Sequence, residues 1–98
     1  MIERIYSLLG LARRAGKITS GESQVEVMLK KGKGHLLILA EDAPGTHKKY
    51  MQWAEDLGLP VLIAGTKQGL GSAIGLSPRS TVLIMDYGFA KAILKVRS

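Results

Sequence analysis

The stretch Leu36-Leu37-Ile38-Leu39-Ala40 is a continuous apolar run, and Glu41 and Asp42 end it. A run of this length without polar alternation favours a β-strand that other elements cover on both faces. Residues 59–64 and 81–85 are similar runs, and Pro60 stands at the start of the first, where a strand tolerates the missing N–H. We therefore predict a sheet whose main strands are buried.

Helical spacing of apolar residues separates these strands. It predicts helices over residues 2–15, from Ser20 or Gly21 to about 31, from Pro44 or Thr46 to 57, over 66–74, and from about 87 to 96. Thr19 and Glu22 have the spacing of a capping box for the second helix. The buried faces of the third and last helices are expected to be Tyr50, Met51, Trp53, Ala54 and Leu57, and Phe89, Ala92, Ile93 and Val96. The link at residues 17–19 is short and can be extended.

Helices that alternate with strands predict an α/β sandwich. We expect a mixed or largely parallel sheet of about four strands, with helices on both of its faces. A chain of 98 residues is the size of one domain, so residues 1–98 are expected to fold together. No apolar stretch approaches the ~20 residues of a membrane helix. Without a signal peptide in the sequence, we expect a soluble cytoplasmic protein that contacts no membrane.

Charge is the most informative feature of the composition. Fourteen Lys and Arg against eight Asp and Glu give a net charge of +6. This balance is typical of a nucleic-acid binder, although a merely basic soluble protein would share it. The chain has no cysteine, which excludes disulfides, zinc–thiolate sites and thiol nucleophiles.

Catalytic chemistry has few candidates. His35 and His47 lack metal-ligand spacing, and the glycine-rich residues 65–71 match neither a Walker loop nor a dinucleotide fingerprint. Glu41 and Asp42 follow a buried strand, where ligands bind in open α/β sheets, so they could serve in acid–base work. A strand end or helix cap is the favoured interpretation. We expect no enzyme activity, no metal and no cofactor.

Basic residues lie near the expected helix ends and loops. They are Arg13, Arg14, Lys17, Lys30, Lys31, Lys33, Lys48, Lys49, Lys67 and Arg79. On one side of an α/β sandwich they could form one phosphate-binding surface, although each run can also be a solvated face. The aromatic residues form no stacking platform on a strand. We therefore expect helix ends and loops, rather than a sheet face, to meet a structured RNA.

An ordered series of short motifs then carries a family resemblance. The motifs are Gly16-Lys17-Ile18, Gly21-Glu22-Ser23-Gln24, Lys31-Gly32, residues 39–43, Leu59-Pro60-Val61, residues 66–71 and Ala73-Ile74-Gly75. The chain resembles the ribosomal L-seven-Ae family, in its bacterial YlxQ-type branch, from Gly16 to about Ile84. The resemblance implies a three-layer α/β/α sandwich.

The resemblance also implies binding to kink-turn RNA. The partner would be ribosomal RNA or another RNA that contains a kink-turn. In that family the start of the second helix enters a groove at tandem sheared G·A pairs. Gly21 would allow close backbone approach, and Ser23 and Gln24 would stand at the base-reading positions. The loop Leu76, Ser77, Pro78, Arg79, Ser80 would cover an extruded nucleotide. Phosphate contacts would come from Lys17, Lys30, Lys31, Lys33 and Arg79.

The chain departs from the family pattern at three positions. Ser23, Gln24 and Val27 replace the Asn, Glu and Lys of the archaeal pattern. A neutral acceptor bonds guanine about half as strongly as a carboxylate does, so the replacements should weaken binding. We expect a monomer that binds RNA, with ribosomal proteins as further partners. The alternative is a protein-interaction module on the same fold that has lost kink-turn binding.

Overall fold

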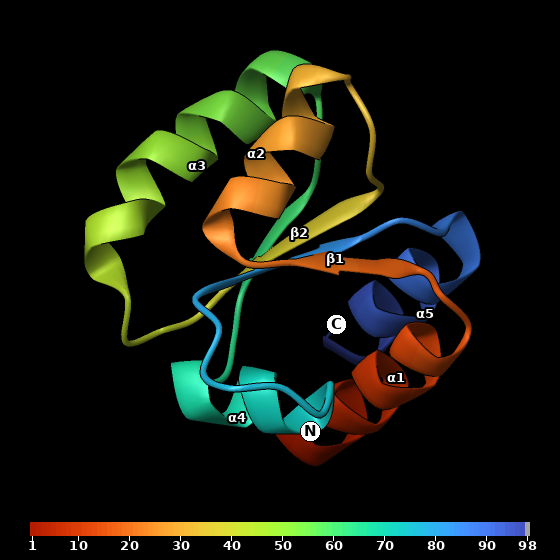
Figure 1. Ribbon diagram of the computed structural model, residues 1–98. Helices are drawn as coiled ribbons and strands as arrows, with labels where there is room; N and C mark the ends of the chain where they lie inside the picture. Colours follow the sequence, from red (N-terminus) through yellow and green to blue (C-terminus); the bar gives the residue numbers. More distant parts are fainter. Residues whose placement is uncertain (98) are drawn as a thin grey trace.

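The computed structural model describes residues 1–97, and over these residues helices and strands alternate (Figure 1). In chain order they are α1 (Ile2–Arg14), β1 (Ile18–Ser20), α2 (Glu22–Lys30), β2 (Leu36–Leu39), α3 (Pro44–Leu57), β3 (Val61–Ile63), α4 (Lys67–Ala73), β4 (Thr81–Ile84) and α5 (Tyr87–Arg97). None of the described helices is both long enough and apolar enough to cross a membrane.

The sheet has the strand order β1-β4-β2-β3. β2 and β3 are parallel, whereas β4 runs antiparallel to both β1 and β2. The sheet is therefore mixed, the first of the two arrangements that the sequence predicted, and it is not largely parallel. Its two central strands, β2 and β4, are buried along their whole length, as their continuous apolar runs predicted. The link after α1 is indeed extended: it forms β1, an edge strand.

Helices cover both faces of the sheet, which confirms the three-layer sandwich (Figure 1). Alternate strand residues face opposite layers. Leu36 and Ile38 pack in a core with residues of α1, α4 and α5. Leu37 and Leu39 pack in a second core with residues of α2 and α3.

Two predictions about helix detail are wrong. Gly21, not Thr19, caps α2, and no side chain bonds the cap. Thr19 cannot cap because it lies in β1, paired with Leu83. On α3, Met51 and Leu57 are 46% and 43% exposed, so the buried face is narrower than expected.

The last helix differs from expectation in the same way. Ala90 and Ile93 are its buried residues. Phe89, Ala92 and Val96, which were expected to point inward, are only half-buried. α5 therefore packs with its Ala90–Ile93 stripe toward the sheet, and the neighbouring positions lie at the edge of the contact.

Loops gather at the two opposite ends of the sheet. We call them the Gly21 end and the His35 end. Backbone hydrogen bonds at the Gly21 end join Gly21 to Thr81, Ala40 to Ser80 and Glu41 to Gly65. Those at the His35 end join His35 to Ile84, Met85 to Lys17 and Leu37 to Pro60. α2 starts at the first end and leads to the second (Figure 1).

Candidate nucleic-acid interface

Gly21 makes the turn from β1 into α2. Its φ of 86° and ψ of 144° belong to a region that only glycine adopts readily. Its N–H donates to the carbonyl of Thr81 at 3.2 Å, which fixes the turn to the start of β4. Among the described residues, only Arg79 Nε comes within 4 Å of the place a Cβ would take, at 3.9 Å. The backbone at the start of α2 is therefore open to close approach, with one cation beside it.

The start of α2 has the polarity that suits an anionic or hydrogen-bond-accepting partner. The first N–H groups of a helix lack intrahelical acceptors, and no side chain caps them here. Ser23 and Gln24 are exposed in this first turn, and so is Glu22. Their positions agree with the sequence prediction, which placed both side chains beside Gly21. The negative charge of the Glu22 carboxylate would repel an RNA phosphate at this point.

Arg79 is held in place by its own loop. Its Nη1 donates to Ser77 Oγ at 2.7 Å, to the Ser77 carbonyl at 3.0 Å and to the Pro78 carbonyl at 3.2 Å. Its backbone N–H donates to the carbonyl of Lys67 at 3.0 Å. The loop thus presents an oriented arginine beside Gly21.

The loop at residues 76–80 is packed against α4. Leu76 N–H donates to the Gly71 carbonyl at 2.8 Å. A Cβ on Gly71 would overlap the Ser77 carbonyl, so the loop backbone passes directly over this helix. At its other end, the Ser80 carbonyl accepts from Ala40 N–H at 3.0 Å. The structure therefore brings the predicted loop to the Gly21 end.

Four predicted phosphate-binding lysines do not lie at this end. Lys30, Lys31 and Lys33 lie at or beyond the last turn of α2, and Lys17 bonds through its carbonyl to Met85 at the His35 end. The nine residues of α2 span about 13 Å, because an α-helix rises ~1.5 Å per residue. The expected single basic surface is therefore divided between the two ends.

Two cations that the predicted site left out lie beside the loop. The carbonyl of Lys67 accepts from Arg79 N–H, and its side chain is exposed. Arg13 Nη1 lies 3.3 Å from where a Cβ on Gly75 would stand, next to the start of the loop. Both residues are visible in the sequence as basic residues at helix ends. Lys67 meets the loop through its carbonyl, and α1, which carries Arg13, packs against α4.

Glu26 anchors α2 to α3. Its carboxylate accepts from Lys49 Nζ and from the Tyr50 hydroxyl, both at 2.9 Å. These two hydrogen bonds, that of Lys49 first, hold the pKa of Glu26 below its usual range. Burial, and then the hydrogen bond to Glu26, raise the pKa of Tyr50. The network links α2 to α3 through one carboxylate.

Glu41 and Asp42 are occupied by backbone donors. Glu41 Oε2 accepts from Gly65 N–H at 3.1 Å, and Asp42 Oδ1 accepts from Lys67 N–H at 2.9 Å. The two carboxylates therefore close the turn between β3 and α4. They do not cap the next helix along the chain, as the sequence suggested, because no side chain caps α3. Within residues 1–97, no group of three or more His, Asp or Glu side chains is arranged to hold a metal ion.

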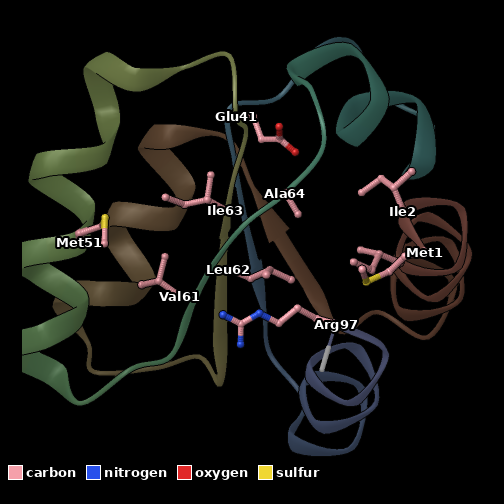
Figure 2. A pocket seen from close by; sticks show the side chains of 10 residues that line it. Met1, Ile2, Glu41, Met51, Val61, Leu62, Ile63, Ala64 and Arg97 are labelled. Atoms are coloured by element: carbon pink, nitrogen blue, oxygen red, sulfur yellow. The ribbon is translucent and has the colours of Figure 1, made fainter.

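A hollow of about 630 Å³ lies along the free edge of β3 (Figure 2). Apolar side chains form most of its lining, including Val61, Ile63 and Met51. Figure 2 shows Glu41 at one end of this groove and Arg97 at the other. It contains neither Gly21 nor any residue of the 76–80 loop, so it is separate from the candidate interface.

Comparison with known proteins places this geometry in a family. The chain is 34% identical to the RNA-binding protein YlxQ of Bacillus subtilis over 92 residues, which cover 93% of this chain and 92% of that protein. It is 30% identical to the large ribosomal subunit protein eL8 of Thermoplasma volcanium over 95 residues, which cover 95% of this chain and 78% of that protein.

A solved structure of a Bacillus halodurans protein of unknown function has the same fold. It superposes with a TM-score of 0.89 at 36% identity, covering 95% of each chain. The model of the ribosomal protein L7Ae/L30e/S12e/Gadd45 family matches residues 3–94, nearly the whole sequence. The chain therefore belongs to the ribosomal protein L7Ae/L30e/S12e/Gadd45 family.

Proposed function

We propose that this protein binds RNA of the kink-turn type, or an RNA of similar shape, at the Gly21 end. One observation carries the proposal: the uncapped start of α2 and the arginine loop meet at Gly21, where the backbone is open to close approach. The two segments lie far apart in the sequence, and only this fold joins them. Together they offer helix N–H donors, polar side chains and a cation on one small surface.

The side chains on this surface suit contacts to base edges. The Gln24 amide oxygen can accept from guanine N1–H and N2–H, and its NH₂ can donate. Ser23 is shorter and reaches a base directly only at close range or through a water. Charged acceptors bond about twice as strongly as neutral ones, so these contacts are weaker than those of a glutamate in the same position.

Arg79 and the loop would serve the strand that leaves the kink. An extruded nucleotide offers both a phosphate and an unstacked base, and a guanidinium can bond the first or stack on the second. Leu76 and Pro78 supply apolar cover in the same loop. Lys67 and Arg13 would add phosphate contacts beside it.

The relatives support an RNA-bound, ribosome-associated role. One carries the name RNA-binding protein, and the other is a large ribosomal subunit protein. We infer that this chain works in the cytoplasm as a single RNA-binding domain, as a monomer beside ribosomal RNA and proteins. Binding, not catalysis, is its proposed activity, since Glu41 and Asp42 are engaged in the fold.

The test is a titration of a labelled kink-turn RNA by the wild type and by a Gln24→Ala/Arg79→Ala variant. A second RNA, with its G·A pairs replaced, reports shape-independent binding. The control variant is Gln52→Ala/Arg4→Ala, which makes the same two changes at exposed positions on α3 and α1. We expect submicromolar binding that needs both the G·A pairs and the two side chains, and that weakens with salt.

A protein-interaction module on the same fold is the second candidate. The apolar side chain of Val27 is 45% exposed on α2, where the archaeal pattern has a lysine. If both RNAs bind equally weakly and salt abolishes the binding, the kink-turn proposal is wrong and this candidate is favoured.

A further inference from the structure

The lysines that the Gly21 end does not use form a second basic surface. Lys30, Lys31 and Lys33 are exposed around the end of α2, and Lys17 lies at the same end of the sheet. Cations at a helix C-terminus stabilise the helix dipole, which accounts for Lys30 and Lys31. Lys33 lies beyond the helix, so its position is not explained in this way.

Lys33 stands in a well-defined turn. Gly32 N–H donates to the Leu29 carbonyl at 2.9 Å, and Lys33 N–H donates to the Met28 carbonyl at 3.0 Å. Gly34 has a φ of 110°, and a Cβ there would overlap the side chain of Leu83. The turn is therefore packed down on β4 and presents Lys33 from a fixed backbone.

An exposed aromatic ring accompanies these cations. Tyr87, the first residue of α5, is 65% exposed. Its ring lies edge-on to His35, with the centroids 6.1 Å apart and an interplanar angle of 69°. Contact with His35 on one side limits the motion of the Tyr87 ring and leaves most of it open to a partner.

Lys33, His35 and Tyr87 surround one hollow of about 250 Å³. The rest of its lining is glycine and apolar residues, with no carboxylate. It is smaller than typical small-molecule sites, which measure about 300–1,000 Å³, so it suits one ring and not a whole cofactor. The nearby Asp86 carboxylate accepts from Phe89 N–H at 2.9 Å, which engages it at the start of α5.

We propose that the His35 end is a second RNA-binding surface, which takes an unpaired strand with one base against Tyr87 and adjacent phosphates against Lys31 and Lys33. Aromatic rings stack on bases of any sequence, and lysines track the backbone beside them. A duplex hides its base faces and would gain little from Tyr87. The surface is separated from the Gly21 end by the length of α2, so it acts independently of kink-turn recognition.

The probe is a labelled octamer of adenylate, titrated at low salt and followed by fluorescence anisotropy. Tyr87→Ala should weaken binding about fivefold or more, whereas Tyr87→Phe, which keeps the ring, should bind like the wild type. Lys33→Ala should lower the slope of log K against log salt by about 0.7, the value for one phosphate contact on a single strand. Arg4→Ala removes a charge on α1 and serves as the matched control.

The same assay separates this inference from the kink-turn proposal. The Gln24→Ala/Arg79→Ala variant should bind the octamer as the wild type does, whatever its effect on kink-turn RNA. The inference is overturned if the wild type does not bind the octamer, if Tyr87→Ala binds it unchanged, or if the Gln24→Ala/Arg79→Ala variant loses it.

Discussion

Arg79 lies beside Gly21, with its Nε 3.9 Å from the position that a Cβ on Gly21 would occupy. This proximity places the loop before β4 beside the turn that starts α2. Gly21 N–H also bonds the carbonyl of Thr81, two residues after Arg79. The two parts of the candidate interface are therefore one structural unit. A substitution in either part should alter the conformation of the other.

The conformation of Gly21 makes it sensitive to substitution. Gly21→Ala should lower the free energy of unfolding by about 1–3 kcal/mol, because φ = 86° with ψ = 144° strains any residue with a Cβ. Chemical denaturation measures this change. Gly45→Ala is the control, since Gly45 lies in α3 with open space around it. An equal loss in the two variants would contradict the argument.

Ser77 should act on RNA only through Arg79. Ser77→Ala removes one of three acceptors of Arg79 Nη1 and should weaken kink-turn RNA binding about two- to fivefold, with little change in stability. A double-mutant cycle checks the route. In an Arg79→Ala background, Ser77→Ala should have no further effect, and a full additive loss would mean that Ser77 contacts the RNA itself.

The central strands could be predicted from the sequence because both of their faces are buried. Residues 36–39 and 81–84 are apolar at nearly every position, which is a strong signal. β1 consists of three half-buried residues at the edge of the sheet. Its hydrophobic pattern is too short to show a period, so the sequence predicted only a short link there. Such an edge strand is recognised by its pairing with a neighbouring strand, which here is β4.

The rotation of α3 could not be predicted from spacing. Met51 and Leu57 fit a helical apolar stripe, yet Tyr50, whose hydroxyl donates to Glu26 on α2, is buried and Met51 is not. Sequence spacing gives the width of a stripe but not which neighbour it meets.

The candidate interface was predictable in part. The motif around Gly21 and the loop at 76–80 came from a family resemblance, and the fold brings them together. The separation of Lys30, Lys31 and Lys33 from Gly21 could have been foreseen, since a helix of nine residues has ends about 13 Å apart. The approach of Lys67 and Arg13 to the loop depends on helix packing that no local pattern encodes.

Glu26 should make the stability of the fold depend on acidic pH. Its pKa is lowered in the folded state by Lys49 and Tyr50, so its stabilising effect is present above the unfolded-state pKa of about 4.3. The effect is lost as the pH falls through the lower folded-state value. Denaturation between pH 7 and pH 2 should show a smaller acid-side loss of stability for Glu26→Gln than for the wild type. Glu55→Gln, an exposed glutamate on α3, should keep the wild-type slope.

Gly71 provides the sharpest test of how the arginine loop is held. Gly71→Ala changes the free energy of unfolding through two opposing effects, and the sign of their sum can be predicted. Alanine is a better helix former than glycine by about 1 kcal/mol, so in an open helix the change would stabilise the protein. Here the new Cβ would overlap the Ser77 carbonyl and crowd Pro78, and both contacts are with backbone atoms that cannot rotate away.

Overpacking against backbone costs about 1–3 kcal/mol, so Gly71→Ala should be destabilising and should displace residues 76–80. Kink-turn RNA binding should then fall with it, although no RNA-facing side chain has changed. The matched control is Ser72→Ala, the exposed neighbour on α4, which should be neutral or slightly stabilising in denaturation and should bind RNA normally. If Gly71→Ala were stabilising and still bound RNA normally, the loop would not depend on α4, and the orientation of Arg79 beside Gly21 would need another cause.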